Sequence, residues 1–154
     1  MDVKNLSITF ITKKMDECRE FYQKFFNGKI TFDCGWYFTI MFFNGDYKMD
    51  ISFLNPNNDY TTYPGSEIPF SGGVTLNIIV EDPDKEYEKY KDAGLEIIQG
   101  LGDCPWGDHS FLAKDPIGNN LYIYKYIKPS AEFVDSYTDK TAYAEHGIFD
   151  DKNL

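Results

Sequence analysis

The sequence predicts an α+β protein built from two copies of a single β-α-β-β-β module. Helical periodicity occurs in two segments, and each follows one strand-like run and precedes three others. The spacing is also regular, since the offset between two predicted strand starts, Ser7 and Thr75, nearly equals that between two predicted helix ends, Gly28 and Gly94. A constant internal offset of this kind is typical of a duplicated unit.

The predicted first module spans residues 4–54. It begins with a strand at 6–11, in which the polar residues Ser7 and Thr9 alternate with apolar ones. A helix is predicted over 15–27, because four side chains follow the i, i+3, i+4, i+7 spacing of an amphipathic helix. These side chains are Cys18, Phe21, Tyr22 and Phe25.

Capping residues and turns delimit the elements of this module. Asp16 lies near the helix start, where a carboxylate favours the helix dipole, and Gly28 is expected to form the C-terminal cap. Three strands follow, at 29–34, 36–43 and 47–54. Gly35 separates the first two, and Asn44-Gly45-Asp46 joins the last two, with Asn-Gly as a strong hairpin signal.

The predicted second module spans 73–127 and repeats this order. A strand at 74–80 precedes Asp82-Pro83, which combines a capping residue with a proline in the first turn of a helix. The buried side of this helix is marked by Tyr87, Tyr90 and Ala93, and Gly94 ends it. Three strands complete the module: 95–99, a strand around Phe111, and 120–126.

Two segments lie outside the repeats. Residues 55–72 are rich in Asn, Pro and Gly, which indicates a connecting loop that serves either as a rim of the site or as a linker only. Residues 128–154 form a C-terminal extension with a short predicted helix at 130–137. It is expected to contact a second subunit, to cover a cleft, or to dock on the surface as a tail.

Composition limits the classes of partner. With 154 residues, 42% of them hydrophobic and 18% aromatic, the chain has enough apolar side chains for a packed interior. The net charge of −10 argues against nucleic acid or an anionic membrane as partner, and is compatible with a cationic ligand. The three cysteines are widely spaced and the first residues are too polar for a signal peptide, so a cytoplasmic, soluble protein is expected.

Strand periodicity assigns one face of each strand to the helices and the other to a cleft. The predicted helix-facing residues are apolar: Leu6, Ile8, Phe10, Met49, Ile51, Phe53, Val74, Leu76, Ile78, Val80, Leu121 and Ile123. The opposite face is mostly polar or aromatic: Ser7, Thr9, Ile11, Lys48, Asp50, Ser52, Thr75, Asn77, Ile79, Asn120, Tyr122 and Tyr124. Two sheets that curl towards each other would enclose this face, which suits a ligand pocket.

One stretch carries a family resemblance. Pro105-Trp106-Gly107, followed by Asp115-Pro-Ile-Gly-Asn119, resembles the signature of the vicinal oxygen chelate superfamily, which includes glyoxalase I, bleomycin-resistance proteins and extradiol dioxygenases. The resemblance covers roughly residues 4–127. It implies the glyoxalase/bleomycin-resistance-like fold, in which paired modules wrap around a cleft, commonly in a homodimer.

The resemblance also locates the superfamily's metal ligands on this chain. The positions that usually hold His, His and Glu correspond to Ser7, Thr75 and Tyr122, and the first module's acidic position corresponds to Asp50. Hydroxyl groups are poor ligands for divalent ions at neutral pH. The two histidines, His109 and His146, lie at neither histidine position. We therefore expect no metal and no cofactor.

Other reactive side chains give weaker signals. Asp50 is interpreted either as a general base or cation anchor, or as a solvated carboxylate. His109 is interpreted as an acid–base group or as an ordinary hydrogen-bonded histidine. Cys34 and Cys104 lack a paired base and are expected to be small buried residues. The sequence has no Gly-rich phosphate loop, nucleophile elbow or His-Glu-x-x-His motif.

The leading prediction is metal-independent binding of a small planar or cationic molecule, as in the bleomycin-resistance branch. Aromatic faces beside carboxylates suit such a ligand through stacking and cation–π attraction. The predicted ligand-binding residues are Ser7, Trp36, Phe38, Asp50, Thr75, Asn77, Trp106, His109, Phe111, Tyr122 and Tyr124. Two alternatives are a metal-dependent lyase, isomerase or dioxygenase with an atypical site, and a protein whose cleft serves only partner or regulatory contacts.

Overall fold

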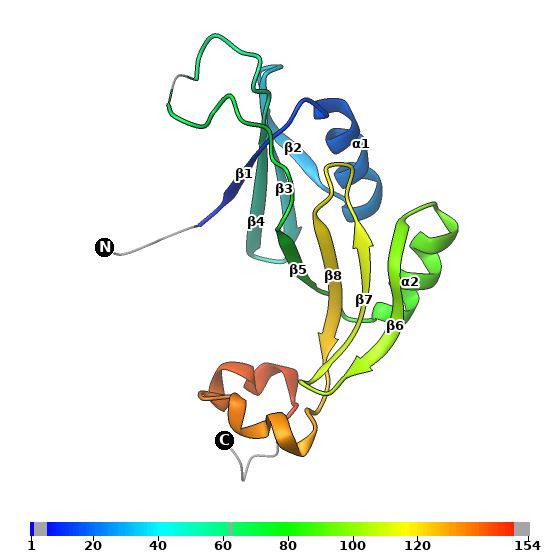
Figure 1. Ribbon diagram of the computed structural model, residues 1–154. Coiled ribbons are helices and arrows are strands. Elements are labelled where there is room, and N and C mark those ends of the chain that lie inside the picture. Colours follow the sequence, from blue (N-terminus) through cyan, green and yellow to red (C-terminus); the bar gives the residue numbers. More distant parts are fainter. Residues whose placement is uncertain (2–5, 62, 150–154) are drawn as a thin grey trace. The chain divides into compact units, whose positions relative to one another are not determined.

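The computed structural model describes Met1 and residues 6–61 and 63–149, which form two four-stranded mixed sheets, each accompanied by a helix (Figure 1). The predicted α+β class with two β-α-β-β-β modules is confirmed. The chain divides into two compact units, Met1–Gly73 with Asp115–Asn119, and Val74–Lys114 with Asn120–Leu154. The predicted first module, connecting loop and extension each include residues outside the described ones: 2–5, 62 and 150–154.

The first unit contains β1 (Ile8–Ile11), α1 (Met15–Phe26), β2 (Lys29–Asp33), β3 (Tyr37–Asn44) and β4 (Tyr47–Leu54). The strand order is β1-β4-β3-β2, with β1 parallel to β4 and antiparallel pairing elsewhere. The β3–β4 hairpin closes through the predicted Asn-Gly turn, where Gly45 has a positive φ of 57°.

Helix α1 forms because its apolar side chains recur on one side, and four of them are buried: Met15, Cys18, Tyr22 and Phe25. The helix ends at Asn27, which adopts the left-handed conformation with φ 53°. The expected cap at Gly28 is therefore wrong by one residue, because Asn also tolerates this conformation. Gly28 is instead required for close packing, since an added Cβ would lie 2.6 Å from Cδ1 of Ile40.

The predicted core of this unit is correct at its centre and wrong at its ends. Phe10 and Phe53 are buried, as expected. Leu6, which precedes β1, is 89% exposed, and Met49, close to the β3–β4 hairpin, is 57% exposed. Alternation predicts the face of a strand, but it does not show how far along that strand the helix covers it.

The Asp115–Asn119 turn is organised by one buried carboxylate. Asp115 accepts hydrogen bonds at Oδ1 from the backbone N–H groups of Ile117 (3.1 Å) and Asn119 (2.8 Å). At Oδ2 it accepts from the Asn119 side chain (2.7 Å) and from the hydroxyl of Tyr22 on α1 (2.8 Å). Asp115 is 5% exposed, and its charge is compensated by these four donors. This part of the signature therefore has a structural role.

Asp115→Ala is expected to lower the free energy of unfolding by about 3 kcal/mol, because it leaves several buried donors without an acceptor. Urea unfolding measures this change. Tyr22→Phe is the graded control: it removes one of the four donors and should cost about 1 kcal/mol. Equal losses in the two variants would contradict the role given to the carboxylate.

The second unit contains β5 (Thr75–Ile79), α2 (Pro83–Asp92), β6 (Glu96–Cys104), β7 (Asp108–Lys114) and β8 (Asn120–Tyr126). The order is β5-β8-β7-β6, with β5 parallel to β8. Asp82 caps α2 as predicted, since its side chain accepts from the N–H of Lys85. Strand β6 runs five residues beyond the predicted end at Gln99, because irregular pairing with β7 lets it continue through Gly100 and Gly102.

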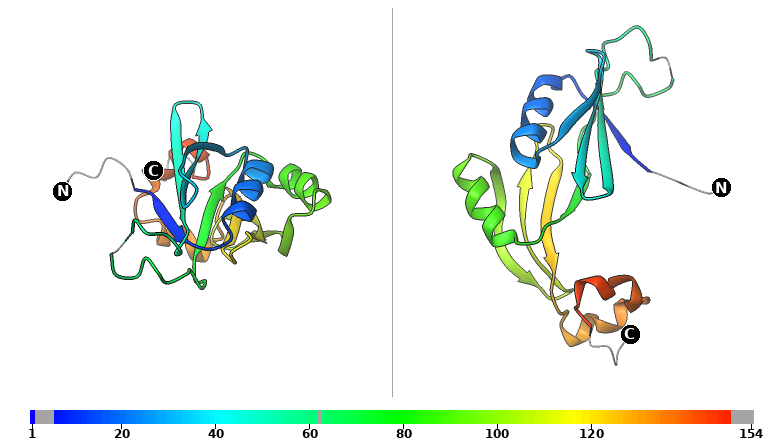
Figure 2. Two further views of the ribbon diagram at one scale, coloured as in Figure 1. Left: turned by 90° about the horizontal axis from the view of Figure 1, so that it is seen from above. Right: turned by 180° about the vertical axis from the view of Figure 1, so that it is seen from behind.

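The extension folds back on the second unit as two short 3₁₀ helices, Ala131–Ser136 and Lys140–His146, drawn in orange and red beyond the end of β8 (Figures 1 and 2). The first confirms the predicted short helix, and the second was not predicted. Ser130 donates from its N–H and its hydroxyl to the carbonyl of Pro105, at 2.9 and 3.0 Å. The Tyr137 hydroxyl donates to the carbonyl of Trp106 at 2.6 Å.

Within the described part of the chain, no helix has both the length and the apolar character that crossing a membrane requires.

Candidate functional site

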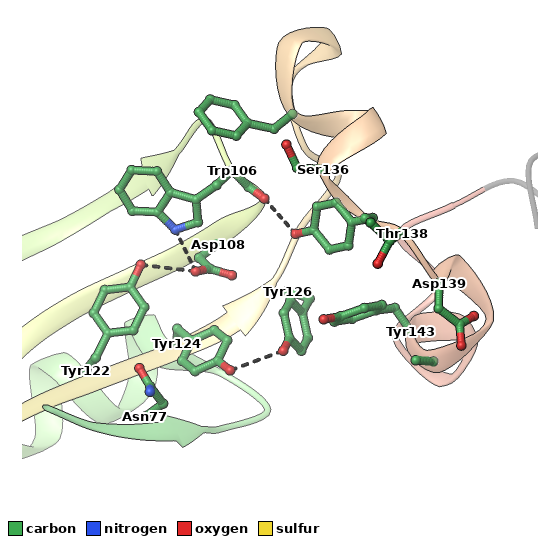
Figure 3. Close-up of a pocket in the computed structure, with 13 residues that line it drawn as sticks. Asn77, Trp106, Asp108, Tyr122, Tyr124, Tyr126, Ser136, Thr138, Asp139 and Tyr143 are labelled. Atoms are coloured by element: carbon green, nitrogen blue, oxygen red, sulfur yellow. Dashed lines mark hydrogen bonds between the residues drawn. The ribbon is translucent and has the colours of Figure 1, made fainter.

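The second unit contains a pocket of about 420 Å³ between its sheet and the extension (Figure 3). This volume lies within the usual range for small-molecule sites. The pocket is lined by Asn77, Trp106, Asp108, Tyr122, Tyr124, Tyr126, Phe133, Ser136, Tyr137, Thr138, Asp139, Ala142 and Tyr143.

Strand register explains why these side chains meet. Asp108 on β7 pairs with Tyr126 on β8, and Asn77 on β5 pairs with Tyr122. Cross-strand partners lie on the same face of a sheet, and alternate residues of one strand do too. Tyr122, Tyr124 and Tyr126 therefore form a row along β8, and adjacent rings in it are 5.3 and 5.2 Å apart.

Asp108 is the buried charged group of the pocket, with 7% of its surface exposed. Its Oδ2 accepts hydrogen bonds from the indole N–H of Trp106 (2.7 Å) and from the hydroxyl of Tyr122 (3.2 Å). Tyr122 in turn accepts from the hydroxyl of Ser110 at 3.0 Å. No described residue donates to the other oxygen, Oδ1.

Asp108 Oδ1 is also accessible to solvent. Among the described residues, the one side-chain oxygen or nitrogen that is fully buried without a hydrogen bond is Asn119 Oδ1, and Asp108 Oδ1 is therefore not fully buried. Asp108 lines the pocket, so its unpaired oxygen can be reached from there. Oδ2 thus holds the carboxylate in place, and Oδ1 has no hydrogen-bond donor among the described residues.

Burial controls protonation in this pocket. It raises the pKa of Asp108, although the hydrogen bonds from Trp106 and Tyr122 act in the opposite direction. Burial also raises the pKa of Tyr122 to about 12, and raises that of Tyr124. The tyrosines are therefore neutral at physiological pH, and a positive charge beside Asp108 would relieve its desolvation.

The extension supplies the remaining wall. Tyr143 contacts Tyr126 edge-on at 5.4 Å between ring centroids, and Tyr137 contacts Tyr143 at 5.0 Å. Phe133 faces Trp106 at 6.5 Å. The described part of the extension thus forms one wall of the pocket.

Four of the predicted binding residues line this pocket: Asn77, Trp106, Tyr122 and Tyr124. Thr75 lies on the same face and is exposed, with its hydroxyl 3.5 Å from the side-chain nitrogen of Asn120. It does not line the pocket.

His109 and Phe111 lie on the other face of β7, contrary to prediction. Phe111 is buried and packs edge-on against Tyr87 of α2 at 5.3 Å. The ring nitrogens of His109 lie 2.5 Å from Asp103 Oδ1 and 3.0 Å from Asp84 Oδ2. Alternate residues of a strand face opposite sides. Since Asp108 faces the pocket, His109 and Phe111 face α2.

The other predicted residues belong to the first unit. Ser7 is exposed and Asp50 is half-buried. Trp36 stacks on Tyr60 of the connecting loop, with centroids 5.1 Å apart. Phe38 is a core residue, contrary to the predicted ligand contact: it is fully buried and stacks on Phe53 at 4.8 Å.

The buried carboxylate of the pocket, Asp108, is not among the residues predicted to bind a ligand. Asp108 directly follows the Pro105-Trp106-Gly107 part of the signature, and the sequence assigns it no role. The alternation of β7 could have identified it: Asp108 lies two positions before Ser110, so both side chains are on one face, and they pair with Tyr126 and Tyr124 of β8. The extension residues carried no comparable signal, because a segment outside the repeat has no strand pattern to place it.

Three of the four residues at the superfamily's metal positions, all except Asp50, are poor ligands for a divalent ion. Tyr122 is a neutral phenol whose oxygen is already hydrogen-bonded to Ser110 and Asp108. Ser7 and Thr75 offer only hydroxyls, which bind such ions weakly. Over residues 6–61 and 63–149, the His, Cys, Asp and Glu side chains form no group of three that could hold a metal ion.

Solved structures share this fold. TioX from Micromonospora sp. ML1 is 16% identical with a TM-score of 0.61, over 81% of this chain and 100% of that one. A glyoxalase/bleomycin resistance protein/dioxygenase from Nocardioides is 16% identical with a TM-score of 0.66, over 82% and 85%. A superfamily member from Sphaerobacter thermophilus DSM 20745 is 20% identical with a TM-score of 0.58, over 77% and 93%. These likenesses show the fold alone.

No curated protein sequence matches the chain at a significant level. A family model does match, and it covers residues 6–123, which is most of the chain. The two modules, their order and their strand topology agree with that match. The protein belongs to the Glyoxalase/Bleomycin resistance protein/Dioxygenase superfamily.

Proposed function

We propose that the pocket of the second unit binds a small organic cation without a metal ion. The proposal rests mainly on Asp108, whose buried carboxylate accepts hydrogen bonds from Trp106 and Tyr122 at one oxygen. The other oxygen is open to a pocket lined by aromatic rings. A ligand ammonium or guanidinium would donate to Oδ1 and compensate the buried charge.

The aromatic walls favour the same class of ligand. A cation over the face of Trp or Tyr gains about 0.5–2 kcal/mol per ring, and a planar group on the ligand would stack on the same rings. Among the described residues, the lining contains two aspartates and no Lys, Arg or His, so an anion would be repelled.

The alternatives receive less support. For a metal enzyme with Asp50 and His109, the histidine is a poor ligand because both of its ring nitrogens face carboxylates of its own unit. The second alternative is a cleft used only for contacts with a partner protein. Such a cleft does not need an open pocket of this volume. Sequestration of a cationic drug, as in the bleomycin-resistance branch, is one form that the proposed activity could take.

Two further proposals concern the setting of this activity. We propose a cytoplasmic location, because Cys18, Cys34 and Cys104 are free thiols and Cys34 is exposed. We propose a homodimer on the family resemblance alone, and sedimentation of the purified protein tests it.

Tryptophan fluorescence tests the binding. In Trp36→Phe, the remaining tryptophan, Trp106, reports on the pocket, and we expect phenylethylamine to quench it saturably. The uncharged analogue phenylethanol should have no effect at the same concentration. Adding EDTA should leave the titration unchanged. Equal quenching by amine and alcohol, or loss of the signal with EDTA, would contradict the proposal.

A further inference from the structure

The pocket has a second carboxylate that differs in kind from Asp108. Asp139 lies on the extension, caps the second 3₁₀ helix and is exposed. Its Oδ1 accepts from the N–H and the hydroxyl of Thr141, at 3.1 and 2.5 Å, and these bonds hold its pKa below the usual range. Asp139 is therefore a fixed, ionised group at the rim, whereas Asp108 is enclosed.

Aromatic rings lie between the two carboxylates in the view of Figure 3. Tyr126 is the cross-strand partner of Asp108, and Tyr143 packs on Tyr126 at 5.4 Å. Tyr143 belongs to the short helix that Asp139 caps. Both tyrosine rings line the pocket, so an alkyl chain that runs from one carboxylate towards the other can contact them.

The charged side chains of the pocket lining are both negative. Asp108 and Asp139 are its charged members, and no cationic side chain of the described lining neutralises either one. A monocation would compensate only one of them. Two separated negative groups joined by an apolar path are complementary to two separated positive groups joined by a hydrocarbon chain.

From this arrangement, and on the basis of the proposed cation site, we infer that the ligand is a linear diammonium compound. One ammonium group donates to Oδ1 of Asp108, the methylene chain lies along Tyr126 and Tyr143, and the second ammonium group faces Asp139. The ligand class is therefore aliphatic diamines or polyamines.

Calorimetric titration of the full-length protein tests the inference with hexamethylenediamine and hexylamine as matched probes. A diamine has two equivalent ends, so a single cation site would favour it by a statistical factor of about two only. We expect the diamine to bind about five- to tenfold more tightly, as an additional ion pair predicts. A series from trimethylenediamine to octamethylenediamine should show an optimum length.

Asp139→Asn separates the outcomes. It should reduce the preference for the diamine to the statistical factor, so that diamine affinity falls several-fold more than hexylamine affinity. Asp135→Asn, on the same extension but outside the pocket lining, is the control and should retain the full preference. Binding of both probes with only the statistical difference would overturn this inference and leave the cation site standing. Binding of neither probe would overturn both.

Discussion

Asp108→Asn is expected to weaken cation binding about 30-fold or more and, at neutral pH, to raise the stability of the free protein. Removing one member of a desolvated ion pair weakens binding by about 2 kcal/mol or more, roughly 30-fold in Kd. Stability should rise because the amide oxygen can still accept from Trp106 and Tyr122, while the buried charge is gone. Calorimetry and thermal unfolding measure the two effects.

The pH dependence follows from the raised pKa of Asp108. A carboxyl group with a higher pKa in the folded state binds its proton more tightly there than in the unfolded chain. Its contribution to stability therefore grows as the pH falls through the folded pKa, which lies above the usual value of 3.8. Cation affinity should fall over the same interval, because the protonated group has lost its charge.

Asp103→Asn is a suitable control, since it removes an exposed carboxylate on the other face of the second sheet. It should leave cation affinity unchanged. An Asp108→Asn variant that binds phenylethylamine as well as the unaltered protein would contradict the assignment of the anchor.

Gly107→Ala is expected to have the second large effect, on the docking of the extension. Gly107 has φ +109°, and an added Cβ would lie 2.7 Å from the Tyr137 hydroxyl and 3.0 Å from the carbonyl oxygen of Ile127. The backbone strain costs about 1–3 kcal/mol, and the overpacking costs about 1–3 kcal/mol more. Tyr137 forms part of the pocket wall, so cation affinity should fall about tenfold as well.

Gly94→Ala is the matched control for this variant. Gly94 has φ +90° with no atom within 4 Å of the added Cβ, so the substitution introduces strain without overpacking. It should lower the free energy of unfolding less than Gly107→Ala does, and leave cation affinity unchanged. Urea unfolding and titration with phenylethylamine compare the two. Equal loss of affinity in both variants would show that the extension is not held as described.

Local signals predicted most of the fold. The α1 apolar spacing, the Asp82-Pro83 helix start and the Asn-Gly hairpin each depend on near neighbours in sequence, and all three appear in the structure. The expected cap at Gly28 failed because Asn27 can adopt the same backbone conformation. Exposure of Leu6 and Met49 could not be read from alternation, since it depends on how far α1 extends over the sheet.

The site was predicted less well, because its prediction requires knowing which face of each strand lines the pocket. Apolar neighbours fix the orientation of β8 and β5, so the sequence predicts that Tyr122, Tyr124 and Asn77 share a face, and all three line the pocket. For β7 the sequence predicts only a strand around Phe111 without its orientation, which is why His109 and not Asp108 is predicted at the site. The contribution of Tyr137 and Tyr143 depends on contacts between distant segments, which no local pattern reports.

The extension makes the two halves of a duplicated protein unequal. Both repeats present a sheet, but the described pocket is completed by a segment that follows the second repeat alone. On the proposed function, ligand preference can therefore change through substitutions in residues 128–149, which take no part in the strand pairing of the two repeats. Exchanging this segment between related proteins would be a direct way to transfer selectivity while preserving the scaffold.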